Sequence, residues 1–166
     1  MGATLRFIHL LAMVVWIGGV VFFSFFTTPA LFAVLPRDMA GRVTAALFPR
    51  YYLLGGASGL IAILTLLLQW LRASGGDRRQ QIEMLLLILM LAMTLYAGLA
   101  ILPESSALRP QLRAAGDPTG SAAAERRFAV LHRRSVVLNG LVLLCGIGAL
   151  AALAGRVPLQ PVSEHD

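Results

Sequence analysis

The sequence predicts an all-α integral membrane protein, a bundle of four membrane-spanning helices. The chain has 166 residues, is 58% hydrophobic and 13% charged, and has a mean hydropathy of +0.78. Soluble domains are about 45–50% apolar and about 25% charged. So short a chain has no interior large enough to bury this excess of apolar residues, so lipid must solvate much of it.

Four apolar stretches have the roughly 20 residues that a spanning helix needs, at about 5–35, 51–71, 82–102 and 136–154. The first is longer than the roughly 7–15 apolar residues of a secretory signal, and no small-residue cleavage site follows it. We therefore expect it to be a retained helix. The transmembrane domain is expected to cover residues 1–157, followed by a disordered tail over 158–166 that contains two prolines.

The connections predict two further features of the bundle. Residues 37–48 place apolar side chains at i, i+4 and i+8, with arginines off that stripe, which predicts a short helix lying in the membrane interface. Asp117 and Pro118 form a good N-cap and first-turn pair. We expect a helix to begin there and to run directly into the fourth span, so that the fourth helix extends well beyond the bilayer.

The positive charge of the chain is explained by the membrane. All 14 basic residues are arginines, and they flank the apolar stretches, where arginine contacts lipid headgroups. We therefore expect a lipid bilayer and no nucleic acid as the partner. Arginine in place of lysine, with abundant alanine, leucine and glycine, is typical of a GC-rich bacterial gene, which suggests the bacterial inner (plasma) membrane.

Four spans place both termini on the same side of the membrane. We call this side A, and it also carries the connection between the second and third spans. Side A holds five arginines and side B holds nine, which accounts for all 14. Because cytoplasmic segments carry the excess of arginine, side B is predicted to be cytoplasmic and the termini periplasmic.

Polar side chains within apolar spans are costly in lipid and therefore indicate candidate sites. The candidates near side A are His9, Trp16, Gln69 and Glu83. His9 is read as a metal or haem ligand, or as a proton-handling group paired with Glu83. The structural alternative is an interfacial histidine that is hydrogen-bonded to a neighbour, with Glu83 favouring a helix N-terminus.

The candidates near side B are Thr27, Thr28, His132, Ser135 and Asn139. The last three share one helix face, at i, i+3 and i+7. His132 is expected to lie across a hydrocarbon layer about 30 Å thick from His9. Ligands of one metal ion must lie within a few ångströms of each other, so the two histidines cannot hold a metal or haem together.

Glycines mark expected helix contacts, namely Gly18, Gly19, Gly55 and Gly59. The last two form a G-x-x-x-G pair, a spacing that lets two helices approach closely. Packing within the bundle is favoured over a homo-oligomer interface, which stays the alternative. Cys145 lies in an apolar run and, as the single cysteine, forms no intramolecular disulfide.

Several motifs together resemble those of the transmembrane protein 205-like family, small four-span proteins of unknown function: His9-x6-Trp16-x-Gly18-Gly19, Pro29-Ala30-Leu31-Phe32, Leu35-Pro36, Gly41-Arg42, Leu47-Phe48-Pro49-x-Tyr51 and Phe128-x2-Leu131-His132-x2-Ser135-x3-Asn139. The resemblance implies a four-helix membrane fold and no particular activity. The first motif alone is also similar to the first helix of copper-resistance D proteins and of HemJ-type protoporphyrinogen oxidases. For the latter it implies a haem-binding histidine assisted by a lysine, and this chain contains no lysine.

Three functions follow as hypotheses. The first is a non-enzymatic membrane bundle in transport or stress tolerance of a small solute or metal, with His9 and Glu83 at one mouth and the side B candidates at the other. The second is a redox protein that binds haem or copper through His9. The third is a structural or assembly subunit of a membrane complex.

Overall fold

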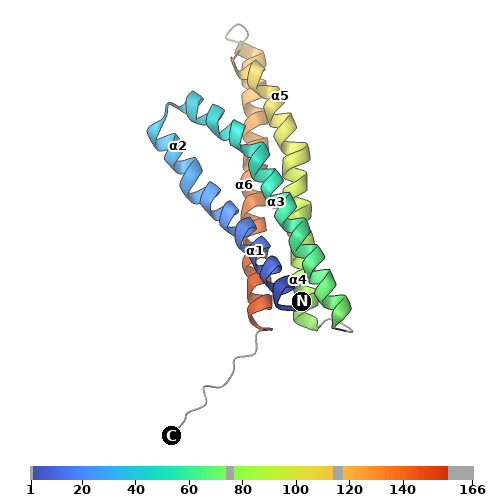
Figure 1. Ribbon diagram of the computed structural model, residues 1–166. Helices are drawn as coiled ribbons and strands as arrows, with labels where there is room; N and C mark the ends of the chain where they lie inside the picture. Colours follow the sequence, from blue (N-terminus) through green and yellow to red (C-terminus); the bar gives the residue numbers. More distant parts are fainter. Residues whose placement is uncertain (1, 74–76, 114–117, 157–166) are drawn as a thin grey trace.

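The computed structural model describes residues 2–73, 77–113 and 118–156, and these residues are almost entirely helical. The elements are α1 (Gly2–Val21), the π-helical turn η1 (Phe22–Thr27), α2 (Thr28–Val34), α3 (Arg37–Arg72), α4 (Arg78–Tyr96), the π-helical turn η2 (Ala97–Ile101), α5 (Leu102–Arg113) and α6 (Pro118–Ala154). Figure 1 shows that they run as an elongated bundle.

Four columns of helix are long and apolar enough to cross a membrane, as expected. They are Gly2–Val34, Arg37–Arg72, Arg78–Leu112 and Ala122–Ala154, each of 33 to 36 residues. At about 1.5 Å per residue, each is roughly 50 Å long and exceeds the hydrocarbon thickness of about 30 Å. The start of α1, the end of α3, the start of α4 and the end of α6 lie at one end of the bundle, side A (bottom of Figure 1).

The helix expected over 37–48 is present, but it is the beginning of α3 and not a separate element. The helix continues through Pro49 without a break. A proline removes one backbone donor, and a membrane helix tolerates this where a nearby side chain satisfies the backbone carbonyls. The carbonyl that loses its donor is that of Ala45, and next to it the guanidinium of Arg50 donates to the carbonyl of Ala46 at 3.0 Å.

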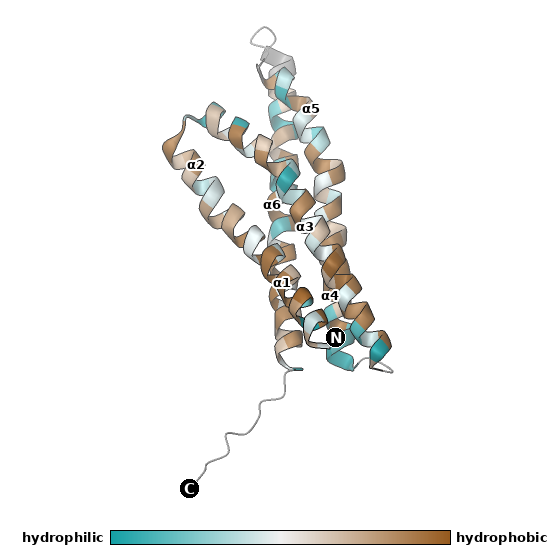
Figure 2. Cartoon of the chain, viewed as in Figure 1, coloured by the Kyte–Doolittle hydropathy of each residue, from teal (hydrophilic) through white to brown (hydrophobic). Residues whose placement is uncertain are grey.

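The fourth helix is extended as expected, because α6 begins at Pro118 and continues for 37 residues. The expected capping residue Asp117 and the expected tail over 158–166 lie outside the described residues. Figure 2 shows that hydrophobic residues predominate along the spans. Phe7, Phe22, Leu99 and Leu144 are each more than 60% exposed, which is the surface that a bilayer would cover.

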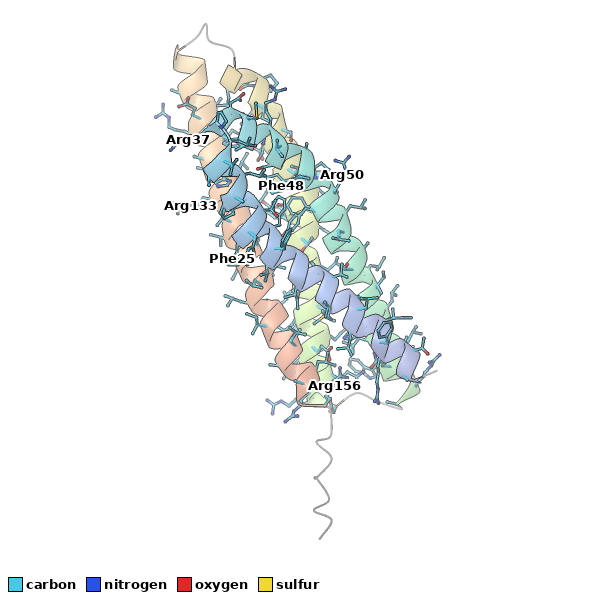
Figure 3. All side chains as sticks on the ribbon, turned by 60° about the vertical axis from the view of Figure 1, so that its left-hand side comes forward. Phe25, Arg37, Phe48, Arg50, Arg133 and Arg156 are labelled. Carbon is cyan, nitrogen blue, oxygen red and sulfur yellow. The ribbon has the colours of Figure 1, made fainter. Side chains whose placement is uncertain are left out.

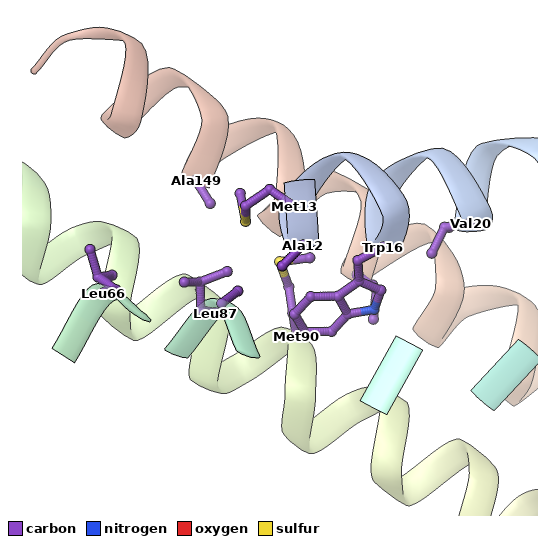
Figure 4. Close-up of a cluster of buried hydrophobic side chains, with 10 residues drawn as sticks. Ala12, Met13, Trp16, Val20, Leu66, Leu87, Met90 and Ala149 are labelled. Atoms are coloured by element: carbon purple, nitrogen blue, oxygen red, sulfur yellow. The ribbon is translucent and has the colours of Figure 1, made fainter. Parts of the chain in front are cut away.

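The larger hydrophobic core cluster lies in the side A half of the bundle (Figure 4), and a second cluster, of Ile101, Leu108, Ala124 and Leu131, joins η2 and α5 to α6 toward side B. Trp16 and Met13 of α1 pack with Leu66 of α3 and with Leu87 and Met90 of α4, and all five are almost fully buried. Figure 1 shows α2 diverging from α6 toward side B. The bundle is therefore closed around this core and opens toward side B.

Two of the four expected packing glycines seat the Trp16 ring. A Cβ atom at Gly59 would lie 2.6 Å from Cη2 of Trp16, and one at Gly55 would lie 3.1 Å from Nε1. At Gly19 the nearest side-chain atom, on Leu54, is at an ordinary 4.0 Å, and at Gly18 nothing lies within 4 Å. Gly55 and Gly59 therefore allow α1 to approach α3, whereas Gly18 makes no such contact within the chain.

The two π-helical turns were not expected from the sequence. Each is followed by a residue that donates five positions back: Thr28 to Phe23 after η1, and Leu102 to Ala97 after η2. A proline comes next in both cases, Pro29 and Pro103. A proline cannot donate to the turn before it, so the wider π turn accommodates a position where the regular α pattern is already broken.

We expect Gly59→Ala to destabilise the protein by about 1–3 kcal/mol, because the new methyl group must displace a ring that is 2% exposed. Gly18→Ala is the matched control, since it adds the same atom where there is space and should be neutral or slightly stabilising. Thermal unfolding of both variants in detergent measures the difference. Equal unfolding midpoints for the two would contradict the role of Gly59 in seating Trp16.

Candidate functional site

The most deeply buried polar group of α1 is His9, whose side chain is 1% exposed. Its Nδ1 atom lies 3.0 Å from the carbonyl oxygen of Ala62 and 3.0 Å from the hydroxyl of Thr65, both on α3. Its Nε2 atom lies 2.8 Å from Oε1 of Glu83 on α4. One imidazole thus joins three helices at side A.

Glu83 is fully buried and has a second partner. Its other carboxylate oxygen accepts a hydrogen bond from the guanidinium of Arg156, which follows the end of α6. Asp77 caps α4 by accepting from the backbone N–H of Gln80 at 2.8 Å, and the buried Gln80 side chain donates to the carbonyl of Leu66 at 3.4 Å. These contacts hold α4 in the register that presents Glu83 to His9.

We call His9, Thr65, Glu83 and Arg156 the side A network. Four helical columns contribute to it: α1, α3, α4 and the end of α6. An ionised side chain is expensive inside a membrane unless it is paired, and here each charged group has a partner of opposite or complementary character. The network therefore holds the four helical columns together at the side A end of the bundle through polar contacts.

The structure brings together only two of the four side A candidates, His9 and Glu83. Trp16 lies on the same face of α1 but deeper, in the apolar core. Gln69 is half-buried on α3, and its amide nitrogen has no hydrogen-bond partner among the described residues. Sequence reasoning missed Thr65 and Arg156. Thr65 could have been found as a polar residue inside the second span, whereas Arg156 has the position of an ordinary headgroup arginine.

The geometry of His9 does not fit a haem or metal ligand. A histidine that binds a metal offers one ring nitrogen to the ion and the other to a supporting acceptor. Both nitrogens of His9 are already engaged within the protein, one by Ala62 and Thr65 and the other by Glu83. Among the described residues no three His, Cys, Asp or Glu side chains are grouped closely enough to hold a metal ion.

A second polar site lies toward side B, in a cavity of about 330 Å³ between the η1–α2 segment and α6. We call it the side B cavity. Its polar lining consists of Ser24, Thr28, His132, Ser135 and Asn139, and its apolar lining of Val20, Phe23, Phe25, Phe48, Val136, Gly140 and Leu143. Figure 3 shows Phe25 and Phe48 in the half of the molecule that lies away from Arg156.

Two tyrosines of α3 position the polar face of α6 beside this cavity. The hydroxyl of Tyr51 donates to Oδ1 of Asn139 at 3.2 Å, and the hydroxyls of Tyr52 and Ser135 are 3.1 Å apart. The Tyr51 ring in turn stacks on Phe23, with ring centroids 4.7 Å apart. An aromatic layer therefore connects η1, α3 and α6 at this depth.

Four of the five side B candidates line the cavity, namely Thr28, His132, Ser135 and Asn139. Thr27 does not line it. His132 is exposed, and its ring stacks on Phe128 one turn earlier, with centroids 6.5 Å apart. Tyr51 and Tyr52 are also polar residues at this depth, and two consecutive hydroxyl-bearing residues in an apolar span are a usable sequence signal.

The two sites lie at opposite ends of the bundle, as expected for His9 and His132. Along α6, the distance from His132 to Ala154, beside the side A network, is about 33 Å at the rise of an α-helix. The layer around Trp16 fills the space between the sites. The sites are therefore separate, and no residue belongs to both.

We expect Glu83→Gln to lower the free energy of unfolding by about 3 kcal/mol or more, because it removes the carboxyl group on which both His9 and Arg156 depend in a buried place. Glu104→Gln is the matched control. Glu104 pairs with Arg127, but both side chains are largely exposed, so its loss should cost less than about 1 kcal/mol. Denaturant unfolding in mixed micelles compares the two, and equal costs would show that the buried network does not fasten the bundle.

Comparison with known protein families gives one match. Residues 11–114 match the family described as Domain of unknown function (DUF4149), a stretch that contains Trp16, Thr65 and Glu83 but neither His9 nor α6. No curated protein and no solved structure matches the chain. The matched family has no assigned function, and neither has the transmembrane protein 205-like family that the sequence motifs resemble. The two families have different descriptions. Because the match covers more than half of the chain, this multi-pass membrane protein belongs to the DUF4149 family.

Proposed function

We propose that the protein binds a small amphiphilic solute in the side B cavity and acts in its transport or in tolerance to it. The observation that carries this proposal is the composition of the cavity wall, which combines five polar residues with a mostly aromatic and aliphatic lining. Ligand sites typically combine an apolar lining with a few convergent polar groups that fix orientation. The side B cavity has this composition.

The order of the lining residues along the helices supports an amphiphile. Thr28 and His132 lie nearest the side B end of their helices, whereas Val20 and Leu143 lie two to three turns deeper. A molecule with a polar head and a short hydrocarbon tail would fit with its head among the hydroxyl, amide and imidazole groups. Its tail would lie among the deeper apolar side chains, as a lipid lies in one leaflet.

The charges around the cavity favour an anionic head. Arg133 follows His132 directly on α6, and nine of the 14 arginines belong to side B. Guanidinium groups recognise carboxylates and phosphates through paired hydrogen bonds. We therefore propose a small carboxylate or phosphate amphiphile as the solute class.

The Trp16 layer separates the side B cavity from the side A network in this conformation. If the protein confers tolerance simply by binding the solute in the side B cavity, the conformation described here is sufficient. Transport across the membrane requires a second conformation in which this layer opens. Such an opening would have to move the Trp16 ring away from Gly55 and Gly59, because the ring packs directly against these two glycines.

The two other functions receive less support from the geometry. A haem- or copper-binding redox protein would need a free nitrogen on His9, and both are engaged. A subunit that assembles through Gly55 and Gly59 would need these glycines on an outer surface, whereas both are buried beneath Trp16. Solute binding is therefore the function that we propose.

The proposed function can be tested with decanoate as the probe and decyltrimethylammonium as the control of opposite charge. In nanodiscs, His132→Ala or Asn139→Ala should weaken decanoate binding about tenfold, the loss expected for one polar contact of about 1–2 kcal/mol. The same variants should fail to complement a deletion strain exposed to the solute.

The adjacent threonines provide matched controls for this experiment. Thr28→Val changes the cavity wall and should weaken binding, whereas Thr27→Val makes the same chemical change outside it and should not. Normal binding and complementation by both His132→Ala and Asn139→Ala would refute the proposal. Preferential binding of the cationic probe would refute the proposed charge of the solute.

We further propose that the protein resides in a bacterial inner membrane with both termini in the periplasm, because side B carries nine arginines and side A five. Reporters that are active in only one compartment, fused to either end of the chain, should both give the periplasmic signal. A reporter placed in the side B connection after α2 should give the cytoplasmic signal. Signals from opposite compartments for the two ends would contradict an even number of spans.

A further inference from the structure

The hydrogen bonds of His9 determine how many protons the side A network holds. A carbonyl oxygen can only accept a hydrogen bond, and Nδ1 of His9 lies 3.0 Å from the carbonyl of Ala62. Nδ1 must therefore carry a proton and donate it. If Nδ1 were bare, two lone pairs would face each other in a buried site.

Thr65 is the one neighbour that could reverse this assignment, by donating its hydroxyl proton to Nδ1. Its hydroxyl oxygen lies 2.7 Å from the carbonyl of Ile61 and 3.0 Å from that of Ala62. Back-bonding of this kind to the preceding turn is the usual arrangement for a threonine inside a helix. The hydroxyl proton is thus used on α3, which leaves the oxygen free to accept from Nδ1.

With Nδ1 protonated, the contact between Nε2 and Oε1 of Glu83 requires a second proton. A bare Nε2 and a carboxylate oxygen are both acceptors, and they lie 2.8 Å apart with both side chains buried. Either the imidazole is doubly protonated and Glu83 is a carboxylate, or the imidazole is neutral and Glu83 is a carboxylic acid. Both arrangements hold one proton more than a neutral histidine beside an ionised glutamate.

We propose that His9 and Glu83 form a proton-binding site within the membrane, with the bound proton lying between Nε2 and Oε1. The site is built from the fixed acceptor of Ala62 on one side and from the guanidinium of Arg156 on the other. This inference goes beyond solute binding and does not depend on it, since no residue of the side B cavity takes part.

Among the described residues, few other polar or charged groups lie beside the site. On α1, Arg6 is exposed; on α3, Thr65 is the polar contact; on α4, Gln80 bonds to Leu66. Arg79 of α4 lies against Gly155, beside Arg156. Loss of the bound proton would leave two acceptors in contact and would weaken the joint between α1 and α4.

Nitrogen-15 NMR of the full-length protein in nanodiscs, labelled at histidine, tests the proposal. His9 should show a protonated Nδ1, because the carbonyl of Ala62 can only accept a hydrogen bond. The sequence contains three histidines, so the variants His132→Gln and His165→Gln together assign the signals. If Nε2 of His9 is also protonated, the proton resides on the imidazole; if it is bare, the infrared spectrum must show the carbonyl band of a protonated Glu83, absent in Glu83→Gln. A bare Nδ1, or a bare Nε2 without that band, overturns the proposal.

Two variants sharpen this experiment. In Glu83→Gln the amide can donate to Nε2, so His9 should become a neutral imidazole that is protonated at Nδ1 only. Thr65→Val removes the hydroxyl but keeps the shape and the Ala62 acceptor, so the state of His9 should not change. If Nδ1 is bare in the unmodified protein and becomes protonated only in Thr65→Val, the hydroxyl was the donor, which also overturns the proposal.

Discussion

A carboxyl group cannot stay in a low-dielectric interior without partners, and Glu83 obtains two from segments that lie far apart in the sequence. His9 belongs to the first column of helix, and Arg156 follows the last. Satisfying one buried carboxyl group therefore requires the beginning and the end of the chain to meet beside α4. Lipid supplies little driving force for apolar helices to associate, so polar contacts of this kind carry more of the specificity.

The side A network explains the uneven shape of the bundle. At side A the helices are joined by hydrogen bonds, and directly above them by the Trp16 layer (Figures 1 and 4). Toward side B, α2 has fewer partners and stands away from α6, and the side B cavity lies between them. The first column, Gly2–Val34, is therefore held against its neighbours at side A and stands away from α6 at side B. Each of its two ends contributes to one of the two candidate sites.

The number of spans, their approximate positions and the all-helical class could be predicted because lipid imposes them on any chain of this composition. The polar residues could be sorted by depth for the same reason. The hydrogen-bond partners of these polar residues could not be predicted, because the depth of a side chain does not say which neighbour it faces. His9 and Glu83 were paired as a hypothesis, but Arg156 looked like any arginine at a helix end. The continuity of α3 through Pro49 was missed because a proline usually ends a helix in water, whereas in this bundle it does not.

The π-helical turns have a consequence for how this architecture can vary between related chains. Each turn contains one residue more than an α-helix would need, and an α-helix rotates by about 100° per residue. Deleting a single residue within Phe22–Thr27 would restore the regular spiral and leave the side chains of α2 on nearly the same faces, because the wider turn already absorbs the extra residue. The same deletion in the regular part of α1 would instead turn everything beyond it by that angle. This position can therefore gain or lose one residue without turning the mouth of the cavity away from α6.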